Sequence, residues 1–181
     1  MTLFRIFYST LLIVTIGIYL TMVIWVLPEI SAAANGQVPF DMRPTGYTFE
    51  EAIIFLKSLS EEGRILYLGL QHTLDAFFPG LLGILLVVAF IKLMSPKWAA
   101  FFSLFAIAGS VCDYLENSGV KDMLTVYSSS PPMVTPEMVS TVSYFTVLKS
   151  LASTIAYVAL LVMLVKWGVD KYRAKKSTSN Q

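Results

Sequence analysis

Four long apolar stretches limit how this chain can fold more than any other feature of its sequence. They occupy residues 6–27, 67–94, 98–117 and 138–167. Each has about the 20 residues that a helix needs to cross a hydrocarbon core of about 30 Å. Because backbone groups in lipid must be hydrogen-bonded within the protein, each stretch is expected to be α-helical. The sequence therefore predicts an all-α membrane protein, with a single four-transmembrane-helix bundle over residues 1–170.

Composition agrees with a membrane protein and excludes several other classes. Hydrophobic residues make up 56% of the 181 residues and charged residues 14%, against about 25% charged in a typical soluble domain. A net charge of +1 with no basic face argues against nucleic acid as a partner. The single cysteine, Cys112, excludes an internal disulfide and cysteine-type zinc sites.

Local signals mark the ends of the expected spans. Pro28 is expected to end the first, and "SPKW" at 95–98 to form a tight turn between the second and third. "TPEM" is expected to open the fourth, with Thr135 as N-cap and Pro136 as the first helical residue. Residues 171–181 read as a polar cytoplasmic tail, and its end, "KKSTSNQ", is expected to be disordered.

The segment 28–64 is predicted to lie outside the membrane and to cap the bundle. Within it, 48–63 has the pattern of a short amphipathic helix, with a capping box from Thr48 and Glu51 and a C-terminal stop at Gly63. The preceding turn-rich loop, 39–47, contains prolines that stiffen it and is expected to be ordered.

Basic residues near the span ends predict the orientation. Eight fall on the side that holds both termini and the 95–98 turn: Arg5, Lys92, Lys97, Lys166, Lys171, Arg173, Lys175 and Lys176. Four fall on the other: Arg43, Lys57, Arg64 and Lys121. Both termini are therefore expected in the cytoplasm. The lack of cysteine pairs fits a bacterial inner membrane.

The first apolar stretch has a second interpretation, a cleaved signal peptide. "SAAANG" at 31–36 offers small residues at the spacing that a signal peptidase requires. The apolar run is longer than the 7–15 residues of an ordinary signal sequence, so we expect an uncleaved span. Mass spectrometry of the N-terminus of the purified protein would decide between the two.

Four ionisable residues are expected to share one level of the bundle. At about 1.5 Å per residue, Asp75, Asp113, Glu116 and Lys149 lie about 24–28 Å from the cytoplasmic lysine of their own span. His72 and Asn117 come out at about 30 Å, just beyond this layer. Lys149 shares its helix face with Thr146 and Ser153. The layer is thus predicted in the outer part of the bilayer.

Charged side chains in lipid cost about 2.5–3.5 kcal/mol each on insertion scales, so these groups are expected to face one another or water. If Asp75, Asp113, Glu116 and Lys149 are all ionised, their charges sum to −2. The excess requires a protonated carboxyl, a protonated His72, a bound cation, or Arg43 or Arg64 reaching in from outside.

Two kinds of role are open for the polar residues. As a site, His72 would be a general acid or base with Asp75 and Glu116, and the ligand would be bound by Asp113, Asn117, Lys149 and Arg43. As structure, Lys149 would fix helix register by a buried ion pair, and Arg43 would hold the carboxylates at a helix end. His72, Asp75, Asp113 and Glu116 are suitable metal ligands but lack a recognised spacing, so no metal is predicted and no cofactor is indicated.

With four spans and several acidic groups toward one leaflet, the chain resembles the sterol isomerase and sigma-2 receptor group of membrane proteins. The resemblance covers topology only, with no motif matched residue by residue. We expect an internal polar pocket near the outer leaflet that binds a membrane lipid or small amphipathic molecule, with acid–base chemistry as a further expectation. The alternative is a non-catalytic subunit or assembly factor that binds a membrane protein partner.

Overall fold

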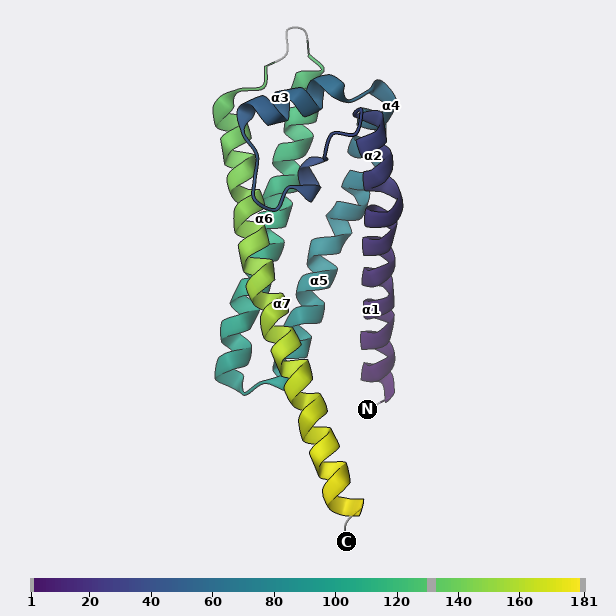
Figure 1. Cartoon of the computed structure of the whole chain (residues 1–181), viewed down its shortest axis with the longest axis vertical. Helices are drawn as coiled ribbons and strands as arrows, with labels where there is room; N and C mark the ends of the chain where they lie inside the picture. Colours follow the sequence, from purple (N-terminus) through teal and green to yellow (C-terminus); the bar gives the residue numbers. More distant parts are fainter. Residues whose placement is uncertain (1, 130–132, 180–181) are drawn as a thin grey trace.

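The computed structural model describes residues 2–129 and 133–179, and these residues form helices and loops without a β-strand. Four helices are long and apolar enough to cross a membrane: Leu3–Ala33, Glu61–Leu93, Pro96–Tyr127 and Pro136–Lys176. They run along the long axis of the molecule (Figure 1). The prediction of an all-α membrane protein with four spans is confirmed.

The first span does not end at Pro28, so that prediction was wrong. Helix α1 (Thr2–Thr21) passes through a π-helical turn, η1 (Met22–Val26), into α2 (Leu27–Ala33). In the π turn, the Leu27 N–H bonds to the Met22 carbonyl five residues earlier. A proline ring in a regular helix clashes with the carbonyl four residues before it. The wider turn just ahead of Pro28 changes which carbonyl faces the proline ring, and the helix continues.

The second span starts earlier than expected and carries a π turn of its own. Ser60 caps α4 (Glu61–Leu66), which continues through η3 (Tyr67–Gln71) into α5 (His72–Leu93). The turns η1 and η3 pack against each other. Pro79 lies inside α5, where the Ser110 hydroxyl of the next helix donates a hydrogen bond of 2.7 Å to its carbonyl.

The third and fourth spans are α6 (Pro96–Tyr127) and α7 (Pro136–Ser179). Helix α7 begins at Pro136, and the Thr135 hydroxyl accepts a bond of 3.3 Å from the Met138 N–H, as the sequence predicts. It remains helical through Ser179, so the expectation of a disordered tail was wrong up to that residue. Residues 180–181 lie outside the described part of the chain.

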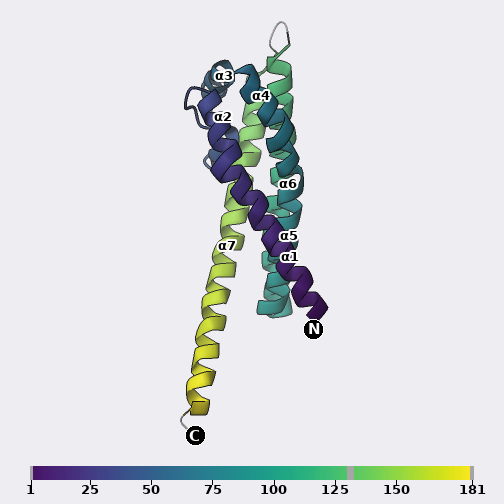
Figure 2. The same cartoon turned by 90° about the vertical axis from the view of Figure 1, so that its right-hand side faces the viewer.

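Helix α5 is the centre of the bundle. It packs against α1, α6 and α7, and α6 and α7 pack along each other. Its most apolar window is 39% buried, against 22%, 22% and 17% for the first, third and fourth spans. Both termini lie at one end of the bundle, opposite α3 (Figures 1 and 2). We call these the terminal end and the α3 end.

Small residues allow α6 and α7 to approach closely. A Cβ on Gly119 would overlap the Cγ2 of Val142, and a Cβ on Gly109 would lie 2.9 Å from the Ser153 hydroxyl. Close approach of backbones through small residues is a common means of helix association in lipid. Gly119 therefore sets how near α7 can lie to α6.

The segment between the first two spans folds over the α3 end of the bundle. It contains the short η2 (Phe40–Met42) and helix α3 (Phe49–Ser58). The capping box is present: the Glu51 N–H bonds to the Thr48 hydroxyl at 3.2 Å, and the Thr48 N–H to the Glu51 carboxylate at 2.8 Å. Helix α3 ends at Ser58, not at Gly63. Gly63 instead lies in α4, where a Cβ would come within 2.6 Å of Ala33.

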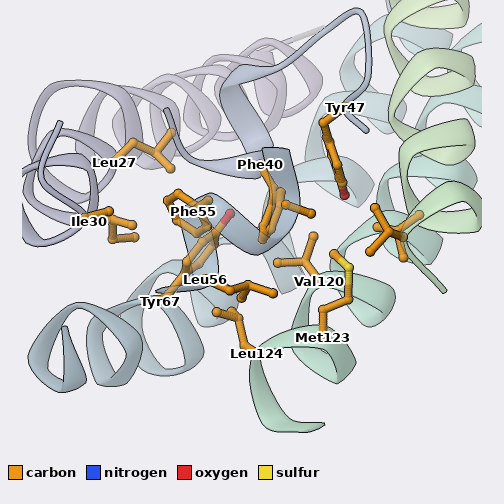
Figure 3. Packing of buried hydrophobic residues seen from close by; sticks show 14 of the residues in the cluster. Leu27, Ile30, Phe40, Tyr47, Phe55, Leu56, Tyr67, Val120, Met123 and Leu124 are labelled. Carbon is orange, nitrogen blue, oxygen red and sulfur yellow. The ribbon is translucent and has the colours of Figure 1, made fainter. Parts of the chain in front are cut away.

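A cluster of buried rings and aliphatic side chains fixes this segment to the bundle (Figure 3). The Phe40 ring meets Phe55 edge-on with 4.8 Å between centroids. The Arg43 guanidinium lies 5.8–5.9 Å from the ring centroids of Phe40, Tyr47 and Phe55. These contacts hold the loop against the bundle, and the loop carries Asp41 to the polar site described next.

Candidate functional site

Lys149 of α7 and two carboxylates of α6 form an ion-paired group. The Lys149 Nζ lies 3.3 Å from Asp113 Oδ1 and also contacts Glu116 Oε2. Thr146, which shares the Lys149 face, donates a bond of 2.8 Å to the other Glu116 oxygen. The Glu116 side chain is 1% exposed. The ammonium thus has two carboxylate partners from its own chain.

Asp75 enters the same region from α5. It is 5% exposed, and the Gln71 amide donates a bond of 2.9 Å to its Oδ2. Gln71 is fully buried, and its own Oε1 has no hydrogen-bond partner among the described residues. Gln71 was not identified from the sequence, although a glutamine one helical turn before an aspartate in an apolar run is a readable signal.

Asp41 reaches the site from the loop and was also missed. Its carboxylate accepts a hydrogen bond from the Tyr67 hydroxyl, which ties the loop to η3. Nearby, the Tyr47 N–H bonds to the Ser143 hydroxyl of α7 at 2.8 Å. Burial, assisted by the Glu116 charge, raises the pKa of the Tyr47 phenol above its usual range.

The larger of two cavities at the site lies between α1 and α7 and has a volume of about 390 Å³, within the range of small-molecule sites. The charged side chains that line it are Asp41, Asp75, Asp113 and Lys149. Aromatic rings from three helices also line it, those of Tyr19, Phe78 and Tyr157. Ser150, Ser153 and Thr154 add hydroxyl groups from α7.

The smaller cavity holds about 10 Å³, close to what one water molecule needs. His72, Asn117 and Tyr67 line it together with Asp41 and Asp75, which also line the larger cavity. Asn117 is 6% exposed, and its Nδ2 has no hydrogen-bond partner among the described residues. A water here would satisfy that amide and lie between His72 and the two carboxylates.

All the residues predicted from the sequence except Arg43 thus lie at three places in and beside the two cavities. Asp75, Asp113 and Lys149 line the larger cavity, and His72 and Asn117 line the smaller one with Asp75. Glu116 is buried against Lys149 and Thr146.

Arg43 lies apart from the charged group. It donates bonds of 2.9 and 2.7 Å to the Val38 carbonyl and lines an outer hollow with Gln37 and Glu51. Its position thus differs from the expected contact with the carboxylates of α6. In residues 2–129 and 133–179, no three His, Cys, Asp or Glu side chains are grouped closely enough to hold a metal ion.

No protein-family model matches this chain, and no curated protein or solved structure is significantly similar to it. The geometry of the two cavities and of the charges around them therefore carries the functional interpretation.

Proposed function

We propose that this protein binds a small amphipathic or lipid-like molecule in the larger cavity. The observation that supports this most is the composition of the cavity wall, which combines carboxylates and an ammonium with aromatic rings between two membrane-crossing helices. A polar headgroup would meet the charged side chains, and an apolar body would lie against the rings. A ligand would enter between α1 and α7, because residues of both helices line the cavity.

The proposal places the cavity in the outer leaflet of a bacterial inner membrane, with both termini in the cytoplasm. It is supported by the excess of basic residues at the terminal end. In this orientation α3 lies on the outer side and covers the bundle. Its buried face, from Ala52, Phe55 and Leu56, packs on the bundle below it.

Acid–base chemistry on the ligand would depend on Asp75. This carboxylate lines both cavities, so a ligand in the larger one and His72 across the smaller one both lie next to it. A single water in the smaller cavity would connect the imidazole of His72 to Asp75 and carry a proton between them. Glu116 is buried behind Lys149 and would act on a ligand only through that ammonium.

Native mass spectrometry of the protein, extracted in mild detergent, tests the binding function. We expect an amphiphile to remain bound to the wild-type protein. Ser150→Phe should displace it, because Ser150 lines the cavity and a phenyl ring would occupy that space. The matched control is Leu151→Phe, at the next position of α7, where the side chain is 58% exposed and should face lipid. Equal retention by both variants would contradict the proposal.

The second candidate function is that of a non-catalytic subunit or assembly factor of a membrane complex. It is supported by the pairing of Lys149 with two carboxylates of its own chain, since such a group can hold helices together without a ligand. This candidate predicts a protein partner, and no amphiphile, in the same native mass spectrum. Under it, His72→Ala would leave the complex intact, whereas disruption of the Lys149 ion pairs would reduce its yield.

A further inference from the structure

The charges around the larger cavity do not balance. Among the described residues that line it, three are acidic and one, Lys149, is basic. Lys149 is already paired with Asp113 and with Glu116, which lies behind it. The hydrogen-bond partners of the other two carboxylates are neutral groups, the Tyr67 hydroxyl for Asp41 and the Gln71 amide for Asp75. With Asp41 and Asp75 both ionised, the cavity therefore carries negative charge that no basic side chain in its lining compensates.

This imbalance disfavours an anionic headgroup. A phosphate or carboxylate would have to compete with Asp113 and Glu116 for Lys149, and it would lie beside Asp41 and Asp75. Like charges at short range repel strongly where water is scarce. A cationic headgroup would instead gain from the unbalanced carboxylates.

The aromatic wall points to the same class of headgroup independently. The rings of Tyr19 and Phe78 stack with 5.8 Å between centroids, and Tyr157 lines the cavity from α7. The faces of aromatic rings attract ammonium groups, and cages of aromatic rings bind quaternary ammonium ligands. Both kinds of partner are present within one cavity.

A further cavity, also of about 390 Å³, lies nearer the terminal end. It is lined by α1, α5 and α7, with Leu12, Val88 and Leu160 among its residues, and apart from Lys92 and Tyr8 its lining is apolar. Along α1, Leu12 lies about 10 Å from Tyr19 at 1.5 Å per residue, and along α7 Leu160 lies about one turn from Tyr157. The two cavities thus lie at successive levels between α1, α5 and α7, and we call this region between the helices the groove.

We propose that the ligand is a single-chain amphiphile with an ammonium head, either a protonated amine or a quaternary ammonium. Asp41 and Asp75 hold the head against the Tyr19–Phe78 wall, and the alkyl chain lies in the groove toward the apolar cavity. This inference rests on the proposed binding function and specifies its ligand.

The test is a binding measurement on the full-length protein in nanodiscs, with empty nanodiscs to subtract partition into lipid. The probe is labelled dodecyltrimethylammonium, displaced by unlabelled dodecylamine, dodecanol or dodecanoate, which share the chain and differ in the head. We expect dodecylamine to displace the probe at a concentration at least about tenfold below that of dodecanol. Dodecanoate should be the weakest competitor.

Variants separate the contributions of head and chain. Asp75→Asn and Asp41→Asn should each weaken probe binding and reduce the preference for amine over alcohol. Leu12→Trp should weaken binding of the dodecyl probe by obstructing the groove, and leave binding of a hexyltrimethylammonium probe unchanged. The control is Ile13→Trp, whose side chain is 69% exposed at the next position of α1. Ile13→Trp should leave the binding of both the dodecyl and the hexyl probe unchanged.

The possible failures are distinguishable. Failure of all four dodecyl compounds to bind would overturn the proposed function and this inference with it. Binding of dodecanoate at least as tightly as dodecylamine would leave the binding function standing and overturn the assignment of an ammonium ligand. Full retention of the amine preference in folded Asp75→Asn and Asp41→Asn proteins would overturn it as well.

Discussion

The ammonium of Lys149 on α7 is paired with the carboxylate of Glu116 on α6, which is 1% exposed. Thr146, one turn before Lys149, donates a hydrogen bond to the second oxygen of the same carboxylate. An ion pair this deeply buried is costly to form and more costly to break on one side only. The interface between α6 and α7 therefore depends on Lys149 keeping its charge.

Lys149→Met should lower the free energy of unfolding by about 3–5 kcal/mol, because it leaves buried carboxylates without a counter-charge. The measurement is denaturant or thermal unfolding of the detergent-solubilised protein. Glu116→Gln added to Lys149→Met should recover part of the loss. Lys166→Met is the matched control, since Lys166 is exposed on the same helix. Unfolding curves that coincide for Lys149→Met and Lys166→Met would show that the pair contributes nothing.

Gly119→Ala should destabilise the bundle by about 1–3 kcal/mol, the usual cost of overpacking. The added methyl group would overlap Val142, a buried side chain with little freedom to move. Gly17→Ala is the control, because a Cβ there meets nothing within 4 Å. The two variants can be compared by midpoint of thermal unfolding. A lower midpoint for Gly17→Ala than for Gly119→Ala would contradict the packing described for α6 and α7.

Thr48→Ala should lower the free energy of unfolding by about 1 kcal/mol, because it removes the acceptor of the Glu51 N–H. The loss of stability should be greatest in helix α3. Hydrogen–deuterium exchange should show faster exchange at the amides of the first turn of α3. Glu50→Gln, at an exposed position of the same turn outside the capping box, should change exchange little. Unchanged exchange in Thr48→Ala would mean that packing alone holds the start of the helix.

Cysteine labelling tests the proposed orientation. In a Cys112→Ser background, Thr45→Cys should react with a membrane-impermeant maleimide on intact cells, because Thr45 lies in the exposed loop at the α3 end. Lys175→Cys, near the other end of the bundle, should react only after the cells are permeabilised. The reverse labelling pattern would place the terminal end outside and invert the topology.

Much of the fold follows from hydropathy, because a helix in lipid satisfies its own backbone and its length is set by the bilayer. Local stop signals were less reliable. Pro28 was expected to end a helix, and a π turn accommodates it. Gly63 was expected to end another, and its small size serves contact with Ala33 instead. Both outcomes depend on neighbours in space, which the local sequence does not encode.

The polar site was predictable where helix geometry alone determines position. A constant rise per residue puts Lys149 level with Asp113 and Glu116, and these three residues meet. The same calculation could not place Asp41, whose position depends on how the loop folds onto Phe55 and Tyr67. It also could not place the cavity, which depends on α1 packing against α5 with space left between α1 and α7.

The π turns η1 and η3 each rotate the helix that follows them about its own axis, relative to the helix that precedes them. A π turn contains one residue more than an α-helical turn, so the helix beyond it is rotated by about 100° relative to an uninterrupted one. In α5 this offset lies just before His72 and Asp75 and sets the direction in which both point. A single inserted or deleted residue, such as loss of Gly69, would therefore redirect the whole apolar half of the helix while leaving its composition almost unchanged.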